Sequence, residues 1–467
     1  IHHLKTQNVN VNMNDRVLLL LILGTSVTAV FSWVNIFPSH NKRQSRRLDP
    51  LRAQNSESEW QSHISTHPEG TSALRRVLGE VSDPESQDVA FLFVGQAHAA
   101  EFEVLVKLAA HHFGTDTQLI SLVGAGVIGE QRELDIPNQA CMSLMTGKLP
   151  KGGKVELLNP SKEDLTDDGD YLLFVDPWSD IEPVLNKLDA SSSVLAGGIS
   201  CPISQDEGTI AYMNQVLVPG SSVAVKFSGT VGLQTVVAQG CRPIGGDALT
   251  ITKVEKGQII TELDGKSAVE VLQEVTNNAK PEDHALIENG LLCGIASSDG
   301  EGDYLSRQIA GLVSGIGGIV IATPNVKEGD KFCFQVRDAE IAEQDLKWMV
   351  ERAKTARMVN GNCRPMAALQ ISCVARGRSL FDVPNMDITN IMEMLPDDDD
   401  KPVIGGFFAN GEIGQVGISG GSASREEKAS HLHGFTTVVA MIYEKSSSES
   451  VDEGAGGAKD ELLDAWG

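Results

Sequence analysis

The chain has 467 residues, which is enough for about two to four domains of roughly 150 residues each. Hydrophobic residues make up 41% of it and charged residues 22%, so we expect sizeable apolar cores rather than a disordered chain. The 63 acidic side chains outnumber the 38 Lys and Arg side chains, giving a formal net charge of −25. This charge excludes nucleic acid as a general partner, because binding there requires basic side chains that neutralise phosphates.

Residues 1–67 differ from the rest of the chain in charge. They carry seven Lys or Arg and four acidic residues, so the other 400 residues have a net charge of −28. Arg16, the apolar run Val17–Leu23 and the small residues Val27–Ala29 are typical of a signal peptide that starts at Met13. We therefore expect residues 1–67 to be a leader, with the native start at Met13 rather than at residue 1.

A stretch rich in Arg, Ser, Asn and Gln follows the signal peptide to about Ser56, and this composition is typical of a transit peptide. The two parts together predict a plastid location. Two alternatives stay open, the secretory pathway and a membrane anchor over residues 17–37. The apolar run is short for a span of about 20 residues, so we expect no membrane insertion of the mature protein. At the other end, residues 446–467 are acidic and Gly-rich and predict a disordered tail.

Between these ends, a pattern of strand, helix, strand and glycines occurs three times. The three copies are 89–94, 102–113 and 119–123 before Gly124-Ala125-Gly126; 171–175, 181–188 and 194–196 before Gly197-Gly198; and 367–371, 388–395 and 403–404 before Gly405-Gly406. Strand-helix-strand crossovers give parallel neighbours, and the strands that follow add antiparallel ones. We therefore predict an α/β fold with mixed sheets and helices on their outer faces. The glycines either line a pocket or permit close packing.

The segment Gly124–Gly129 matches the spacing G-x-G-x-x-G directly after a predicted strand. The dinucleotide fingerprint also requires a helix at the motif and an acid about 20 residues later. Here a polar stretch leads to Pro137, and no acid lies between Asp135 and Glu156. We therefore predict no nucleotide and no other cofactor.

The seven cysteines form no C-x-x-C pair and have no histidine cluster at zinc spacing. An odd number without a framework predicts reduced thiols, mostly in the core, and no metal site. They are Cys141, Cys201, Cys241, Cys293, Cys333, Cys363 and Cys373.

Two segments combine cysteine with arginine at predicted strand ends. Cys373 is followed by Arg376 and Arg378, and Cys241 by Arg242. A cysteine beside arginines would have a lowered pKa and act as a nucleophile. Alternatively, the arginines would clamp a carboxylate or phosphate, for which the guanidinium fork is suited. A plain core role for each cysteine is the third interpretation.

Three further residues follow the third glycine pair. Asn410 and Glu412 stand in a predicted loop, where the carboxylate would either meet an ammonium group or remain in a solvated turn. His433 precedes the last strand and is either a hydrogen-bonded loop anchor or a base.

Five segments in order resemble FIST proteins, the F-box and intracellular signal transduction family. They are Gly240–Gly245, Phe334–Ala339, Ser372–Phe381, Gly405–Gly414 and His433–Thr436. The resemblance runs from about residue 71 to 443 and implies an N-terminal FIST domain, placed at 68–265, and a C-terminal one at 266–445. The family's cysteine motif has Asn or a small residue and Gly before the arginine, whereas Val374 and Ala375 stand there in this chain.

The resemblance implies a sensory module that binds small ligands, amino acids among them. No F-box, kinase or methyl-accepting segment is visible in the sequence, so an output would come from a protein partner. We expect Arg376 and Arg378 to hold a carboxylate and Glu412 to face an ammonium group. Arg242, Cys373, Asn410 and His433 complete the expected site.

Two other functions stay open. One is an enzyme with Cys373 as nucleophile and His433 as base, which the sequence favours less than binding. The other is an interaction or assembly subunit of a plastid complex.

Overall fold

A computed structural model describes residues 60–166, 168–189, 193–296, 304–323, 325–359, 365–393, 402–420 and 429–445. They form two compact units. The barrel unit is Cys241–Asp338, and the three-sheet unit contains the described residues up to Gly240 and from Ala339 onward. The predicted signal peptide, transit stretch and tail lie outside the described residues.

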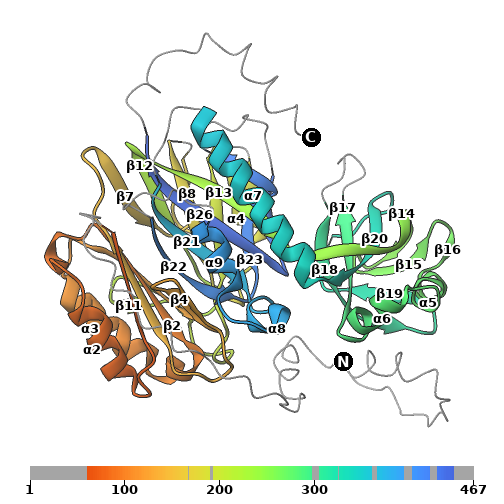
Figure 1. The fold of residues 1–467 in the computed structure, drawn as a ribbon, viewed down its shortest axis with the longest axis horizontal. Coiled ribbons are helices and arrows are strands. Elements are labelled where there is room, and N and C mark those ends of the chain that lie inside the picture. The colour runs from red at the N-terminus through yellow and green to blue at the C-terminus, as the bar shows by residue number, and fades with distance from the viewer. Residues whose placement is uncertain are drawn as a thin grey trace. The chain divides into compact units, whose positions relative to one another are not determined.

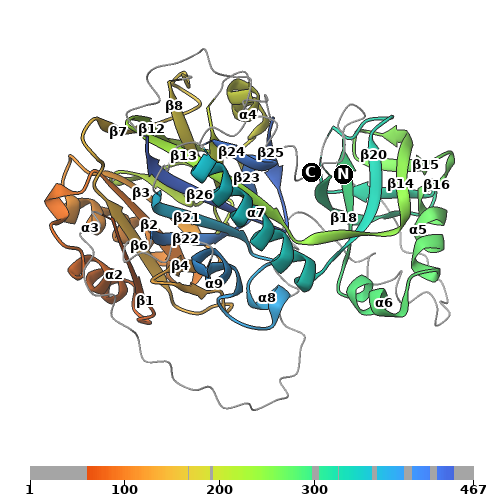
Figure 2. The ribbon, with the colours of Figure 1, turned by 45° about the horizontal axis from the view of Figure 1, so that its top comes forward.

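The three-sheet unit consists of three mixed sheets (Figures 1 and 2). The first contains, in order, β1 (Trp60–Ser65), β6 (Met142–Gly147), β2 (Val89–Gly95), β3 (Gln118–Gly124), β10 (Ile210–Tyr212) and β11 (Gln215–Val216). The second contains β25 (Ser430–His433), β23 (Glu412–Gln415), β9 (Leu195–Ile199), β8 (Gly169–Val175), β12 (Ser222–Gly229) and β7 (Gly153–Leu158). The third contains β24 (Gly417–Gly420), β13 (Val231–Gln239), β26 (Thr436–Glu444), β21 (Pro365–Cys373), β22 (Val403–Ala409), β4 (Val127–Gly129) and β5 (Arg132–Leu134).

Each sheet is built around one parallel pair, namely β2 with β3, β8 with β9, and β21 with β22. The chain between the two strands of each pair contains a helix. These helices are α3 (Phe102–Phe113), α4 (Glu182–Asp189) and, in the third sheet, α8 (Arg378–Phe381) with α9 (Met386–Glu393). Two more, α2 (Gly70–Gly79) and α7 (Ala339–Val359), precede β2 and β21. The predicted α/β class with mixed sheets is confirmed.

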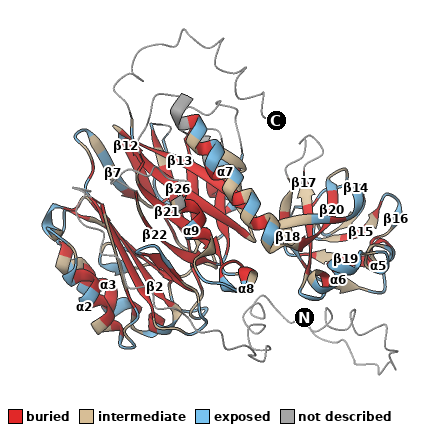
Figure 3. Ribbon diagram, in the orientation of Figure 1, coloured by how far each residue is buried: buried red, intermediate tan, exposed pale blue. Residues whose placement is uncertain are grey.

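The apolar side chains on the inner faces of all three sheets form one shared core. Phe93 and Phe407 stack at its centre with ring centroids 5.5 Å apart, and Phe174 lies 6.2 Å from Phe407. The outer faces are covered by helices: α2 and α3 on the first sheet, α4 on the second, and α7 and α9 on the third. Figure 3 shows the result, with buried strands between helices that expose one side. The helices therefore lie on the outer faces, as the periodicity predicted.

The strands that follow each parallel pair cross into a neighbouring sheet. The β4–β5 hairpin follows β3 of the first sheet but pairs with β22 of the third. The β10–β11 hairpin follows β9 of the second sheet but pairs with β3 of the first. Likewise β23 follows β22 of the third sheet but pairs with β9 of the second. The three sheets thus exchange strands in a closed cycle.

Each crossing is held by the same two backbone hydrogen bonds. At each crossing, one strand residue forms both bonds with the chain that crosses over. Its carbonyl oxygen accepts a hydrogen bond from a backbone amide of that chain, and its own amide donates to a carbonyl oxygen of the same chain. This residue is Val123, Ile199 or Phe408. The pairs are Cys201 N to Val123 O (2.8 Å) and Val123 N to Thr209 O (3.0 Å); Asn410 N to Ile199 O (2.9 Å) and Ile199 N to Gly411 O (2.8 Å); and Ala125 N to Phe408 O (3.0 Å) and Phe408 N to Gly126 O (3.0 Å). We call this arrangement the three-way clasp.

Glycines near the clasp are packed against protein atoms. A Cβ at Gly124 would lie 2.6 Å from a backbone oxygen, and one at Gly198 would lie 2.7 Å from the Ile371 side chain. A Cβ at Gly405 would lie 2.7 Å from the sulfur of Met145. Of the two interpretations of these glycines, close packing is the one that these contacts support.

The folded chain includes residues at the end of the predicted leader. Strand β1 begins at Trp60 and pairs with β6 along its whole length. Trp60 is buried in the shared core, where its indole ring fills the space beside Gly147. Residues 60–65 therefore belong to the first sheet, and the Trp60 side chain packs in the shared core. Among the described residues, none of the helices has both the length and the apolar character required to cross a bilayer.

The barrel unit is a closed antiparallel sheet. Its strand order is β14 (Cys241–Glu255), β20 (Lys331–Arg337), β17 (Leu291–Ala296), β18 (Leu305–Val313), β19 (Gly318–Ile321), β15 (Ile259–Leu263) and β16 (Lys266–Ser267). Pairing between β14 and β15 closes the barrel. Helices α5 (Ala268–Asn277) and α6 (Pro281–Glu288) pack on it, and side chains such as Phe332 and Phe334 fill its core.

The close packing of strands gives a first prediction. A Cβ at Gly197 in β9 would lie 1.9 Å from the carbonyl oxygen of Leu173 on the neighbouring strand. Gly197→Ala should therefore destabilise the protein by at least about 2 kcal/mol, because backbone atoms must move apart. Denaturant unfolding measures the change. Gly79→Ala is the matched control, since nothing lies within 4 Å of its Cβ position, and equal losses in both variants would contradict the prediction.

Candidate functional site

Three of the predicted site residues interact inside the three-sheet unit. The thiol of Cys373 contacts the Glu412 side chain, and the positive charge of Arg376 acts on both. Asp387 and Glu133 surround the same guanidinium. We call these five residues the Arg376 cluster.

Glu412 occupies a position that is apolar at the other two crossings. It is the first residue of β23 and lies opposite Gly198 of β9. The equivalent first residues are Val127 of β4, opposite Phe407, and Ile210 of β10, opposite Leu122. Val127 and Ile210 are buried in the shared core. A carboxyl at the third crossing therefore breaks the apolar pattern of the fold.

One edge of the Arg376 guanidinium is fully occupied by hydrogen bonds to Asp387. It is 1% exposed, and its Nε and Nη2 each donate to a carboxylate oxygen of Asp387 at 2.8 Å. Burial opposes the charge, but the attraction and hydrogen bonds of Asp387 outweigh this and raise the pKa of Arg376. Its Nη1 has no hydrogen-bond partner among the described residues. The fork predicted to clamp a ligand carboxylate is thus occupied by Asp387.

Glu412 is 0% exposed, and only one of its two carboxyl oxygens accepts strong hydrogen bonds from the described residues. Its Oε2 accepts hydrogen bonds from the hydroxyl of Thr436 at 2.7 Å and the amide of Thr436 at 3.3 Å. Its Oε1 has no strong hydrogen-bond donor among the described residues. Burial raises the pKa of Glu412 to about 8, so the carboxyl is largely protonated at neutral pH.

Glu133 is the member of the Arg376 cluster that comes from the first copy of the repeated pattern. It lies on β5, and its Oε1 accepts hydrogen bonds from the Gln370 amide at 2.8 Å and the Ile388 backbone at 3.0 Å. Burial, together with the charge of Asp387, raises the pKa of Glu133 to about 7. The sequence reasoning missed Glu133 and its partner Gln370, because their contact depends on the crossing of β4 and β5 into the third sheet, and it missed Asp387, because that contact depends on how α9 packs.

The Cys373 thiol and the His433 imidazole, predicted as a nucleophile and base, are both buried. Burial, followed by the negative charge of Glu412, raises the pKa of Cys373 above its ordinary value and keeps the thiol protonated. His433 is buried and its Nε2 lies 3.0 Å from the carbonyl oxygen of Gly414. Asn410 is exposed and contributes its backbone to the clasp. A buried thiol with a raised pKa is a poor nucleophile.

The other two predicted arginines have carboxylate partners of their own. Arg378 lies at the start of α8, half-exposed, with its Nε 3.4 Å from Asp135. Arg242 belongs to the barrel unit, where its Nη2 lies 2.5 Å from Asp283 and its Nε 2.7 Å from Asp338. Arg242 is therefore an ion-paired residue of the barrel unit.

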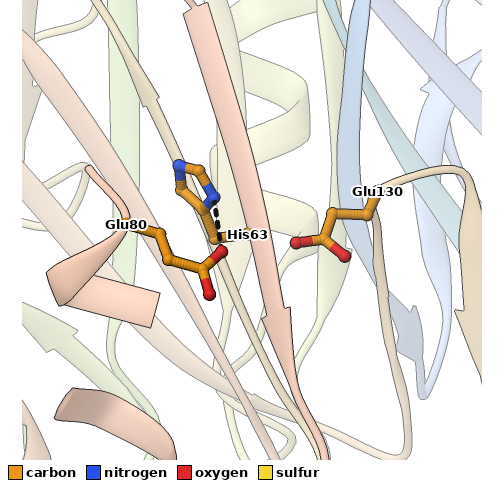
Figure 4. Close-up of side chains that lie close together, drawn as sticks. All are labelled: His63, Glu80 and Glu130. Atoms are coloured by element: carbon orange, nitrogen blue, oxygen red, sulfur yellow. Dashed lines mark ion pairs between the residues drawn. The ribbon is translucent and has the colours of Figure 1, made fainter. Parts of the chain in front are cut away.

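One group of described side chains has the composition of a metal site, and Figure 4 shows it. Nδ1 of His63 lies 3.4 Å from Glu80. The third member, Glu130, already accepts hydrogen bonds from Arg132 at 2.8 Å and from the Ile64 amide at 3.2 Å. We assign no metal to this group, because the Glu130 carboxylate is used by protein donors.

Comparison with known sequences agrees with this architecture. The FIST N domain matches residues 88–266 and the FIST C domain matches residues 268–415, which together are more than half of the chain. The chain belongs to the FIST family. FIST domains are linked to signal transduction and small-ligand sensing. The boundary between the two FIST domains falls beside β16, inside the barrel unit, so the compact units and the family domains do not coincide.

Relatives of this FIST protein occur in mycobacteria. An uncharacterized protein of Mycobacterium bovis is 28% identical over 398 residues, covering 81% of this chain and 97% of the relative. An uncharacterized protein of Mycobacterium tuberculosis is 30% identical over 340 residues, covering 69% of this chain and 83% of the relative. The similarity thus extends over both FIST domains.

The ion pair of Arg376 gives a second prediction. Asp387→Ala leaves a buried cation without its partner and should destabilise the protein by about 3–5 kcal/mol in denaturant unfolding. Glu103→Ala is the control, because Glu103 forms an exposed ion pair with Lys107 on α3 at 2.6 Å. A small loss in Asp387→Ala, similar to that of the control, would show that the Arg376 cluster is open to water.

The raised pKa of Glu412 gives a third prediction. Its folded-state value of about 8 exceeds the ordinary value of 4.5, so folding favours the protonated form. Its contribution to stability is complete below about pH 4.5 and is lost as the pH rises to about 8, at up to about 1.4 kcal/mol per pH unit. Glu412→Gln should remove this part of the pH dependence and raise the unfolding temperature at pH 8.5.

Thermal unfolding of both proteins between pH 5 and pH 8.5 tests this. Glu103→Gln is the control for the general effect of removing an acid from an acidic protein, since Glu103 is exposed. Parallel pH curves for the parent and Glu412→Gln would refute the assignment of a buried protonated carboxyl.

Proposed function

We propose that this FIST protein is a small-ligand sensor that binds the zwitterionic head group of an amino acid at the Arg376 cluster. The ammonium group would meet Oε1 of Glu412, and the carboxylate would meet Nη1 of Arg376. Cys373 would contact the ligand without reacting with it. Arg378, Asn410 and His433 would shape the surroundings, whereas Arg242 would have no part in this site.

One observation carries the proposal. Oε1 of Glu412 and Nη1 of Arg376 are buried polar atoms, a carboxyl oxygen and a guanidinium nitrogen, and neither has a strong partner among the described residues. The charge of Arg376 acts on Glu412, so the two groups belong to one electrostatic environment. Unpaired buried polar atoms are costly, and a ligand that supplies both a donor and an acceptor would remove that cost.

The backbone beside Arg376 supports the same arrangement. A Cβ at Gly240 would lie 3.0 Å from Nη1 and 2.9 Å from the carbonyl oxygen of Phe435. Any side chain at position 240 would therefore press on the guanidinium and the Phe435 carbonyl, and glycine leaves Nη1 in place. The symmetry of the fold adds to this, because an apolar residue would satisfy the fold at position 412, as Val127 does at the first crossing.

The protonation of Glu412 would couple binding to pH. An ammonium group requires the ionised carboxylate, while burial keeps the free carboxyl largely protonated below about pH 8. Binding would therefore release a proton and be tighter at pH 8.5 than at pH 6.5. A protein partner would supply the output of such a sensor.

Thermal unfolding of the full chain with L-alanine, ethylamine or propionate tests the proposal. L-Alanine should raise the unfolding temperature more than either fragment, because only the amino acid pairs with both atoms. Glu412→Gln should weaken the response to alanine by more than about tenfold in concentration, since one charge-assisted hydrogen bond is lost. The other proteinogenic amino acids are screened in the same way.

Glu130→Gln is the matched control, because it removes a partly exposed acid that pairs with Arg132. It should leave the response unchanged. Failure of all twenty amino acids to shift the unfolding temperature, or an undiminished response in Glu412→Gln, would refute the proposal.

A further inference from the structure

The barrel unit is inserted into the three-sheet unit through two linkers of one residue each. Gly240 alone separates β13 from β14, and Asp338 alone separates β20 from α7. The division between the two compact units falls beside these same two residues. The barrel unit also has an apolar core of its own, whose members all lie between Ile244 and Val336. Movement about the linkers is the ordinary expectation for a unit that folds around its own core.

Two backbone contacts, which we call clips, hold the linkers side by side. In the three-sheet unit, a carboxylate oxygen of Asp345 on α7 accepts a hydrogen bond from the amide of Gln239 on β13 at 2.6 Å. In the barrel unit, Cys241 of β14 pairs with Arg337 of β20. The two linkers lie between the clips, so bending is confined to one residue of each strand. Hinges of this kind use a few residues at the ends of elements.

The proposed ligand site borders this hinge. A Cβ at Gly240 would lie 3.0 Å from Nη1 of Arg376 and 3.5 Å from the Cβ of Ala342, near the start of α7. The charge of Arg376 also acts on Asp345, the α7 member of the first clip. Nη1 has no hydrogen-bond partner among the described residues and is the atom proposed to receive the ligand carboxylate. A ligand held there would therefore lie beside the linker.

We propose that the barrel unit is the output element of the sensor, and that a ligand carboxylate on Nη1 of Arg376 sets its orientation through the Gly240 and Asp338 hinge. This inference rests on the proposed function, because it requires a ligand at Nη1. A carboxylate beside Gly240 would restrict the movement of the linker, so binding would favour one hinge state over the others. A protein partner would then recognise the orientation of the barrel unit. Fixing the hinge would change the affinity for the ligand by the same factor.

Hydrogen exchange of the full chain tests the hinge, with and without L-alanine or whichever amino acid gives the largest thermal shift. At about 100 times the dissociation constant, the amides of residues 238–242 and 336–342 should exchange up to about 100-fold more slowly, because opening then requires the ligand-free state. Helix α5 of the barrel unit is the internal control, and its exchange should not change.

Spin labels on exposed positions of the two units measure the orientation directly. One label replaces Lys107 on α3 and the other replaces Lys280 before α6, as Lys107→Cys and Lys280→Cys. The saturating amino acid should shift or narrow the distribution of distances between the labels. A pair within the three-sheet unit, Lys107→Cys with Glu351→Cys on α7, should show no change. The unsubstituted chain, labelled in the same way, gives the background from the native cysteines.

Insertion of Gly-Ser-Gly after Asp338 should uncouple the two units. The thermal shift with the amino acid should persist, because Arg376 and Glu412 are unchanged, whereas the effect of the ligand on the label distances should be lost. The same insertion after Gly315, in the exposed turn between β18 and β19, is the matched control and should preserve that effect.

The two proposals fail in different ways. An amino acid that raises the unfolding temperature but changes neither the hinge exchange nor the label distances would overturn the hinge and leave the binding site standing. A ligand effect on the distances that survives the insertion after Asp338 would overturn the hinge as well. Failure of all amino acids in the thermal test would refute the binding site, and the hinge with it.

Discussion

Six backbone hydrogen bonds at three equivalent crossings hold the three-sheet unit together. Each crossing uses one strand residue, Val123, Ile199 or Phe408, as both donor and acceptor. Without these bonds, each sheet would lose the strands that it receives from a neighbour. The shared apolar core depends on the same exchange, because Val127 and Ile210 enter it only on crossed strands. The clasp therefore couples the packing of every sheet to the other two.

The buried ionisable groups of the Arg376 cluster lie at the crossing that departs from this threefold pattern. Two crossings carry an apolar first residue, and the third carries Glu412. Its environment comes from distant parts of the chain, since Glu133 arrives with the first hairpin and Asp387 with the third-sheet helix α9. A repeated scaffold supplies the rigidity, and its first and third copies supply the ionisable groups. Such division suits a sensor, because a polar site on rigid strands stays pre-formed.

The central strands were predictable from the sequence, and their partners were not. Apolar runs such as Val89–Val94 and Ala367–Ile371 mark buried strands by composition alone. Strand β4 has three residues, and no periodicity in so short a segment indicates that it pairs with β22. The interaction of Cys373, Arg376 and Glu412 followed from family motifs, but the occupation of the Arg376 fork by Asp387 depends on how α9 packs.

Exchange of strands also determines the order in which the sheets can be completed during synthesis. The first sheet has all its strands once Val216 has been added. The second needs β23 and β25, so it remains open until His433 has been made, and the third needs β22, β24 and β26, so it remains open until Glu444 has been made. The β4–β5 hairpin must wait for a partner that begins at Val403. Pairings of such long range are slow to form, and the nascent chain exposes unpaired strand edges throughout most of translation.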